Sequence, residues 1–218
     1  MRVFEAAKTA AKLLVLDEKS LAIVRWILRR GDETLRLDYP LGPASVVFDV
    51  GGYRGDWAEA IASRFDCAIH VFEPVPQYCE LIGRRLGANP KVVINNAGLG
   101  DATRRELISI DEEGSSVEKR SANTCEIQLL DVVEYFASRG VARVDLMKIN
   151  IEGGEYALLA RMHASGLIER CVDLQIQFHD FVPGAREKRR QLREILSRTH
   201  ELTYDYAFIW ENWHLKNA

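Results

Sequence analysis

The chain has 218 residues, of which 47% are hydrophobic and 28% are charged. Its 29 Lys and Arg residues nearly balance its 32 Asp and Glu residues, which gives a formal net charge of −3. These values predict one ordinary globular domain, with at most a small appendage, and they exclude a largely disordered chain or a protein that binds nucleic acids or anionic membranes through bulk charge.

Residues 1–43 differ in pattern from the rest of the chain. Apolar residues recur at helical spacing over 3–16 and 21–28, with Lys and Arg between them, and residues 17–20 can break or cap these helices. The simplest interpretation is an N-terminal helical appendage of one or two helices packed on a main domain of residues 44–218. A lid over a substrate, or a contact surface for a partner or a membrane, are the alternatives.

Strand and helix patterns alternate from Ser45 onward. The apolar, β-branched run at 46–50 is typical of a strand buried on both faces. We expect Asp56 to cap the next helix, with Glu59 completing a capping box.

The rest of the chain continues this alternation. Residues 102–124 are polar and predict a hairpin or an irregular excursion, and residues 129–138 predict a helix. The other predicted strands are 68–72, 91–96, 144–151, 172–178 and 202–210, and the other predicted helices are 77–86, 155–163 and 186–198. Strands joined by helices pair in parallel, so we expect an α/β fold with a doubly wound sheet that binds ligands at the carboxyl ends of its strands.

A glycine-rich turn joins the first strand to the first helix of this domain. Its sequence is DVGGYRGD, from Asp49 to Asp56. Glycine allows a sharp turn and a close approach to a ligand, and the start of the helix offers free N–H groups. Tyr53 stands where a dinucleotide fingerprint requires glycine, which disfavours an NAD-dependent oxidoreductase without removing it as an alternative.

Glu73 follows the second strand, 22 residues after Gly51. A carboxylate at this place can accept hydrogen bonds from both hydroxyls of an adenosine ribose. The alternative is a solvated carboxylate at a strand end, followed by a proline that forms a turn.

Five segments together resemble class I S-adenosylmethionine-dependent methyltransferases, and in particular the FkbM family. They are VVFDVGGYRGDWAEAIA, VFEPVPQYCELI, NNAGLGD, DLMKINIEGGEYALL and QIQFHD, and they span the chain from about Ser45 to its end. The string KINIEGGE is similar to the family pattern Lys-Ile-Asp-x-Glu-Gly-x-Glu. The resemblance implies a Rossmann-like, mostly parallel seven-stranded sheet with a reversed last strand. It also implies methyl transfer from S-adenosylmethionine, typically to a hydroxyl of a sugar or a natural-product-like small molecule, with S-adenosylhomocysteine as product.

The resemblance also implies positions for the cofactor. The glycine turn would hold the methionine part and Glu73 the ribose. Asn96 and Ala97 would lie near the adenine, with Asp101 as a further contact, and Asn150 would border the methyl-transfer site. The implied cofactor-binding residues are Asp49, Gly51, Gly52, Tyr53, Gly55, Glu73, Asn96, Ala97, Asp101 and Asn150.

Two positions depart from the family pattern. Asn150 stands where the family usually has Asp, and Gln177 stands where members often have Glu. A neutral amide is a poor ligand for a divalent cation, so we expect no required metal. Because both departures remove a negative charge, a catalytically inactive module that only binds the cofactor remains an alternative interpretation.

His179 and Glu152 are the candidate catalytic residues. An alcohol acceptor loses a proton during methyl transfer, and the ordinary pKa of histidine suits a general base. His179 follows the fifth strand, and Asp180 could orient its ring; the alternative is a histidine bonded to the backbone. Glu152 follows the fourth strand and faces the same edge, although it could simply stabilise the start of a helix beside Glu155.

Lys148 lies within an apolar strand and needs a partner. The fourth strand should lie beside the first, so we expect an Asp49–Lys148 pair that supports the cofactor turn.

Two further features are ambiguous. The basic run 186–193 is expected to be a solvated helix face, and it alone supports the weaker alternative of an RNA methyltransferase. Trp210, Asn212 and Trp213 could wall an acceptor pocket or lie in the core.

Composition also bears on the compartment. The four cysteines, Cys67, Cys79, Cys125 and Cys171, form no CxxC pair. Glu5 interrupts what would be the apolar part of a signal peptide, and no apolar run reaches the ~20 residues of a membrane span. We expect a cytoplasmic protein with reduced thiols, no transmembrane segment and no nucleic-acid partner.

Overall fold

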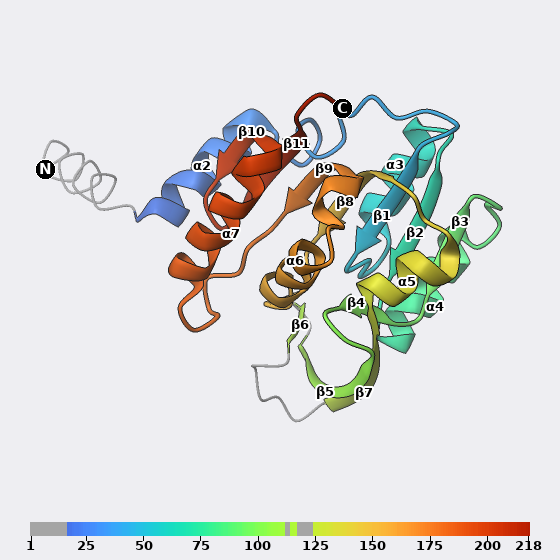
Figure 1. Ribbon diagram of the computed structural model, residues 1–218. Helices are drawn as coiled ribbons and strands as arrows, with labels where there is room; N and C mark the ends of the chain where they lie inside the picture. The colour runs from blue at the N-terminus through green and yellow to red at the C-terminus, as the bar shows by residue number, and fades with distance from the viewer. Residues whose placement is uncertain (1–16, 112–113, 117–123) are drawn as a thin grey trace, which may run out of the picture.

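The computed structural model describes residues 17–111, 114–116 and 124–218. The helix expected over 3–16 therefore lies outside the described residues, as does part of the excursion at 102–124. A seven-stranded sheet in the order β10-β11-β9-β8-β1-β2-β3 forms the middle of three layers, with helices on both faces (Figure 1).

Five neighbouring strands of this sheet run in parallel, and β11 runs antiparallel to both β9 and β10. This confirms the mostly parallel, seven-stranded sheet with a reversed last strand. The strand predicted over 202–210 was wrong in extent, because a turn at 207–209 divides it into two paired strands. The strands are β1 (Val46–Val50), β2 (Ala68–Phe72), β3 (Val92–Asn95), β8 (Val144–Ile149), β9 (Cys171–Ile176), β10 (His200–Tyr206) and β11 (Trp210–Leu215).

Alternate side chains of the buried strands point to opposite faces of the sheet and pack in two separate hydrophobic cores. Val47 and Val71 pack against Trp57 and Ile61 on one face, whereas Phe48 and its neighbours pack on the other. The first face carries α2 (Glu18–Arg29), α3 (Asp56–Arg64) and α4 (Pro76–Leu86); the second carries α5 (Val132–Arg139), α6 (Glu155–Ala164) and α7 (Ala185–Thr199), and a short 3-10 helix spans Ile168–Arg170.

Two helix starts differ from the expectation. Gly55, not Asp56, caps α3, with φ of +84° and no side-chain bond to the helix, so the capping box is absent. Asp56 instead pairs with Arg85 at 2.7 Å. The helix α5 begins only at Val132, because Asp131 caps it by accepting hydrogen bonds from two backbone N–H groups. Residues 129–131 belong to a strand.

The excursion after the third strand builds a second sheet of four strands in the order β4-β7-β5-β6. The expected hairpin is part of a larger arrangement, because β5 pairs antiparallel with β6 on one side and with β7 on the other. Ile108 from β5 and Ile127 from β7 pack on Val75, which follows β2. The sheet thus stands beside the carboxyl ends of the main strands. Its strands are β4 (Gly98–Gly100), β5 (Arg104–Asp111), β6 (Gly114–Ser116) and β7 (Thr124–Asp131).

The described part of the N-terminal segment packs on the main sheet. Asp17 caps α2 by accepting a hydrogen bond from the Ser20 N–H group, and Trp26 lies against the rings of Tyr204 and Tyr206 on β10. No helix among the described residues is long and apolar enough to cross a membrane.

Candidate active site

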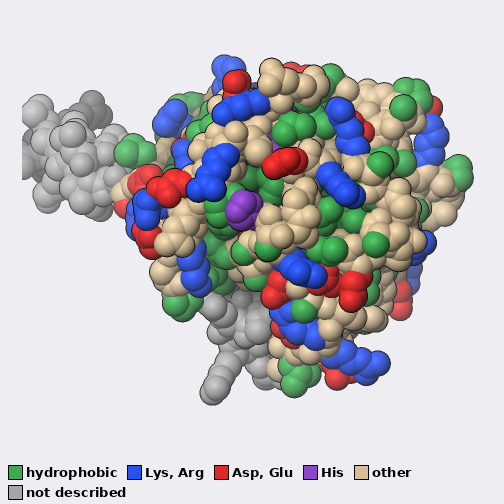
Figure 2. Space-filling view, in the orientation of Figure 1, with side chains coloured by type: hydrophobic (Ala, Val, Ile, Leu, Met, Phe, Trp, Pro, Cys, Tyr) green, Lys and Arg blue, Asp and Glu red, His purple; other side chains and the backbone are tan. Residues whose placement is uncertain are grey.

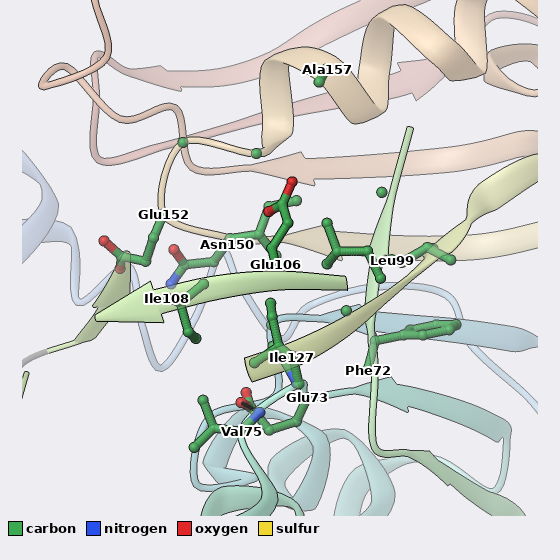
Figure 3. A pocket seen from close by; sticks show the side chains of 18 of the residues that line it. Phe72, Glu73, Val75, Leu99, Glu106, Ile108, Ile127, Asn150, Glu152 and Ala157 are labelled. Atoms are coloured by element: carbon green, nitrogen blue, oxygen red, sulfur yellow. Dashed lines mark hydrogen bonds between the residues drawn. The ribbon is translucent and has the colours of Figure 1, made fainter. Parts of the chain in front are cut away.

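A cavity of about 400 Å³ lies at the carboxyl ends of β1, β2 and β8. This size falls within the range of small-molecule sites. Figure 3 shows Glu73 beside Val75 in one part of the wall and Asn150 with Glu152 in another. The lining residues include Gly51, Tyr53, Glu73, Val75 and Tyr78 from the first two turns, Leu99, Asp101, Arg104, Glu106, Ile108, Ile127 and Leu129 from the second sheet and its turns, and Asn150, Ile151, Glu152, Gly153, Gly154 and Ala157.

The glycine turn depends on Gly51. Its φ of +92° is rarely adopted by other residues, and a Cβ atom there would lie 1.9 Å from the Asn150 carbonyl oxygen. The ends of β1 and β8 can therefore meet only because residue 51 has no side chain. Gly51 and Tyr53 line the cavity, whereas Gly52 and Gly55 are not among its lining residues.

Glu73 connects the second strand to this turn. Its Oε2 accepts a hydrogen bond from the Tyr53 N–H group at 2.7 Å, and its Oε1 accepts one from the Val75 N–H group at 2.9 Å. Burial raises the pKa of Glu73 to about 7, against the opposing effect of these two bonds. Glu73 is 5% exposed and borders the cavity, so its carboxylate both fixes the turn and forms part of the cavity wall.

Lys148 and Asp49 form the expected pair. The Lys148 Nζ atom lies 2.8 Å from Asp49 Oδ1 and donates to the Gly51 carbonyl oxygen at 2.6 Å, with both side chains buried. Two buried oxygens nearby have no hydrogen-bond partner, Asp49 Oδ2 and Asn150 Oδ1. Asn150 also lines the cavity.

A row of polar side chains continues from this pair across the sheet. Asp49, Lys148, Gln175, Asn212 and Tyr204 occupy matching register positions on β1, β8, β9, β11 and β10. The row therefore runs from the glycine turn to the edge of the sheet.

The N-terminal segment covers the far end of this row. Gln175 Nε2 donates to the Tyr39 hydroxyl at 2.7 Å, and that hydroxyl donates to Asn212 Oδ1 at 3.1 Å. Asn212, Trp210 and Trp213 are buried and do not line the cavity, which favours their core interpretation over a pocket wall.

Of the three residues expected near the adenine, one lines the cavity and two do not. Asn96 Nδ2 lies 3.2 Å from the carbonyl oxygens of Glu73 and Pro74, and Ala97 is buried; neither lines the cavity. Asp101 does line it and pairs with Arg104 at 2.7 Å.

Sequence reasoning expected the excursion after Asp101 to contribute to the pocket wall but did not identify the apolar residues that do so. The apolar wall consists of Leu99, Ile108, Ile127 and Leu129, which the second sheet supplies. The short alternation of apolar and polar residues at 105–110 was the available signal.

His179 and Glu152 come together, as the sequence placed them at the same edge. His179 Nε2 lies 3.5 Å from Glu152 Oε1, and His179 Nδ1 lies 3.2 Å from Glu155 Oε1. Glu152 lines the cavity, whereas His179 lies behind it and is 9% exposed. Asp180 was expected to orient the ring, but it pairs with Lys19 at 2.7 Å, and Glu155 takes that position instead.

The charge state of His179 also differs from the expectation of an ordinary histidine. Burial lowers its pKa, but hydrogen bonds to Glu152 and Glu155 and their charges outweigh burial and raise the pKa to about 9. At neutral pH the ring is therefore a cation.

Among the described residues, no group of three or more His, Cys, Asp or Glu side chains is arranged to hold a metal ion. The basic helix α7 is largely neutralised. Arg186 pairs with Glu18, Arg190 with Glu187 and Glu194, and Arg193 with Asp205.

The doubly wound sheet, its reversed strand and the glycine turn with Glu73 define a Rossmann-like fold of the methyltransferase type. The model of the methyltransferase FkbM domain matches residues 49–206. The chain belongs to the FkbM methyltransferase family and is an S-adenosylmethionine-dependent methyltransferase.

Similarities beyond the family are remote. An rRNA methylase from Streptococcus thermophilus is 12% identical over 80% of this chain and 89% of that chain, with a TM-score of 0.44. The precorrin-6y C5,15-methyltransferase of Geobacter metallireducens is 12% identical over 80% and 73% (TM-score 0.42). The N-methyltransferase NodS of Bradyrhizobium japonicum, in complex with S-adenosylhomocysteine, is 10% identical over 79% of both chains (TM-score 0.42). The chain has no match among curated proteins, and none of these similarities indicates an acceptor.

Proposed function

We propose that the protein transfers a methyl group from S-adenosylmethionine to a hydroxyl oxygen of a sugar or natural-product-like small molecule. The observation that carries this proposal is the Glu152 carboxylate in the cavity wall, with the His179 imidazole 3.5 Å behind it. A hydroxyl acceptor must lose a proton, and this pair places proton-handling groups beside the space that a ligand would fill.

The residues of the cavity fit the cofactor. Asn150 has a buried oxygen without a partner, and the glycine turn leaves room that a side chain at Gly51 would remove. Glu73 presents a carboxylate suited to ribose hydroxyls, and Ile108 and Ile127 offer an apolar wall suited to a purine. Asp49, Gly51, Tyr53, Glu73, Asp101 and Asn150 would hold the cofactor, with Gly52, Gly55, Asn96 and Ala97 supporting the turns.

Bound S-adenosylmethionine supplies a methyl group made electrophilic by a sulfonium charge. The protein's own task is alignment and proton removal. The cavity holds the acceptor hydroxyl in line, and the Glu152–His179 pair provides a destination for its proton.

A small acceptor is favoured over RNA by the distribution of charge. Lys and Arg side chains lie among Asp and Glu side chains over the face in Figure 2, rather than in a separate basic patch. Nucleic-acid sites usually show a basic stripe. The same Glu152–His179 pair favours an active enzyme over a module that only binds the cofactor.

The first experiment is calorimetric titration with S-adenosylmethionine, S-adenosylhomocysteine and NAD. We expect both sulfur compounds to bind, NAD to be silent, and Glu73→Ala to weaken binding. A tritium-transfer screen then offers hydroxylated sugars, polyols and natural products in parallel with total RNA and small amines. Label in alkali-stable ethers supports the proposal, whereas label in RNA or amines, or in no acceptor despite cofactor binding, contradicts it.

A further inference from the structure

Glu155 is a fully buried acid beside the cavity. It receives hydrogen bonds from two separate turns. Its Oε1 accepts from the His179 backbone N–H group at 2.8 Å and lies 3.2 Å from His179 Nδ1; its Oε2 accepts from the Gly153 N–H group at 2.9 Å. One carboxylate thus joins the turn after β8 to the loop after β9.

The turn that Glu155 holds is the one that presents Glu152. Glu152 has φ of +50° and Gly153 has φ of +105°, and both values lie in the left-handed region. A non-glycine residue keeps such a conformation only when its surroundings impose it. The bond from the Gly153 N–H group to Glu155 is a local restraint of that kind, and it directs Glu152 toward the cavity and His179.

The ring of His179 faces a carboxylate oxygen at each nitrogen. A neutral imidazole has one N–H donor and one lone pair, so one of its nitrogens would oppose a glutamate without a proton between them. A protonated imidazole has two donors and satisfies both contacts. The raised pKa, about 9, agrees with this geometry.

We propose that Glu155 is a positioning residue that holds His179 as a cation against Glu152, and that Glu152, not His179, takes the proton of the acceptor. This inference rests on the proposed function, because it assigns the proton step of that site. The O–H bond of the acceptor breaks, its electron pair stays on the oxygen that attacks, and the proton forms a bond to a Glu152 oxygen. His179 already carries its proton and stays paired with Glu152 as a cation, with its Nε2 3.5 Å from Glu152 Oε1.

Other charged groups near His179 are occupied elsewhere. Asp180 faces away to Lys19 on α2, at 2.7 Å. The Tyr156 hydroxyl on α6 donates to the His179 carbonyl oxygen at 2.9 Å and leaves the ring free of it. The ring of Phe181 packs at 5.2 Å between centroids and carries no charge. The charge of the His179 ring is therefore set by the two glutamates.

The test is an NMR titration of histidine ring nitrogens in ¹⁵N-histidine-labelled full-length protein, from pH 5.5 to 10. The His179→Gln variant assigns the signal. In the wild type we expect His179 to titrate near pH 9 and to be about 99% protonated at pH 7. Titration near pH 6.5 would overturn the proposal, and the titration itself is made on the wild-type protein.

Two variants separate the roles of the glutamates. Glu155→Gln and Glu152→Gln should each lower the pKa of His179 by at least one unit, while the matched control Asp180→Asn should leave it within about 0.3 unit. A Glu155→Gln protein with the wild-type melting temperature and an unchanged His179 titration contradicts the positioning role.

Turnover is measured with the hydroxyl acceptor found in the screen. Glu152→Gln should lower kcat by at least about 100-fold at unchanged affinity for S-adenosylhomocysteine. His179→Gln should cost less and alter the pH profile; equal loss in both variants contradicts Glu152 as the sole proton acceptor. A protein that binds no S-adenosylmethionine would defeat the proposed function, yet the histidine titration would still decide the charge of the cluster.

Discussion

Two charge clusters lie at the same edge of the sheet, one fully buried and one that reaches the cavity, and they are built differently. The Asp49–Lys148 pair joins one acid to one cation, and Lys148 spends a further hydrogen bond on the Gly51 carbonyl oxygen. The second cluster sets one histidine between two acids, Glu152 and Glu155, one of which borders the cavity. In the first cluster Lys148 also bonds the backbone of the glycine turn and so shapes that turn. In the second cluster Glu152 lines the cavity.

The charge balance of the two clusters follows the same division. One carboxylate and one ammonium cancel, which is the arrangement expected of buried groups that only need to remain in place. Two carboxylates and one imidazolium leave an excess negative charge, and that charge suits a cavity for a cationic sulfonium and a departing proton.

The largest effect is expected for Gly51→Ala. A Cβ atom at 1.9 Å from the Asn150 carbonyl oxygen, at φ of +92°, forces the ends of β1 and β8 apart. We expect at least ~3 kcal/mol lower stability in urea and no measurable S-adenosylmethionine binding by calorimetry.

Gly83→Ala on α4 is the matched control. A Cβ atom there meets nothing within 4 Å, and alanine favours a helix, so stability should be unchanged or slightly higher. Wild-type binding by Gly51→Ala would show that the turn does not shape the cofactor site.

Lys148→Met should come next in size. It leaves Asp49 buried without its cation, at a cost of about 3–5 kcal/mol, and frees the Gly51 carbonyl oxygen. We expect S-adenosylmethionine affinity to fall at least ~10-fold, with a smaller change in kcat. The double variant Asp49→Asn with Lys148→Met should recover part of the stability but not the affinity. Unchanged cofactor affinity in Lys148→Met would contradict the supporting role of this pair.

The two clusters also differ in how far they could be predicted from the sequence. The Asp49–Lys148 pair was predictable. A lysine inside an apolar strand requires an acid, and the strand order places Asp49 on the neighbouring strand. The strands and the glycine turn were predictable for a related reason, since hydrophobic runs and glycines act over a few residues. The His179 cluster was only half predictable: its proximity to Glu152 followed from the strand ends, but its partner Glu155 depends on how α6 meets the loop after β9.

The second sheet marks the limit of local patterns. Residues 102–124 carry few apolar side chains, and Ile108 and Ile127 become a cavity wall only when β5 pairs with β7 and the sheet rests on Val75. The alternation at 105–110 indicates a strand, but neither strand alone shows that the two pair across some twenty residues of chain. The prediction of Asp56 as the cap of α3 was wrong for the same reason. Asp56 pairs with Arg85, which lies on a different helix and is distant in the sequence.

Glu73 gives a prediction of intermediate size in the pH dependence. Its pKa is about 7 in the fold and about 4.5 in an unfolded chain, so the folded state binds its proton more tightly. The stability that this proton confers is complete below pH 4.5 and is lost as pH rises to 7, by up to about 3 kcal/mol. Glu73→Gln should remove this slope in urea titrations between pH 5 and 7.

Cofactor binding should show the opposite trend, since ribose hydroxyls donate to the ionised carboxylate. We expect S-adenosylmethionine to bind about tenfold more weakly at pH 6 than at pH 8 in the wild type, and without this dependence in Glu73→Gln. The same pH dependence in both proteins would assign it to another group.

The smallest effect is expected for Lys19→Met, which breaks the pair that joins α2 to Asp180 beside His179. Both partners are about 40% exposed, so water screens their attraction, and the loss of stability should stay below ~1 kcal/mol. The His179 titration should not move, because Glu152 and Glu155 set it from the buried side. If the pKa of His179 shifted by one unit or more in Lys19→Met, α2 would belong to the His179 cluster. The contrast between that cluster and the Asp49–Lys148 pair would then have to include this helix.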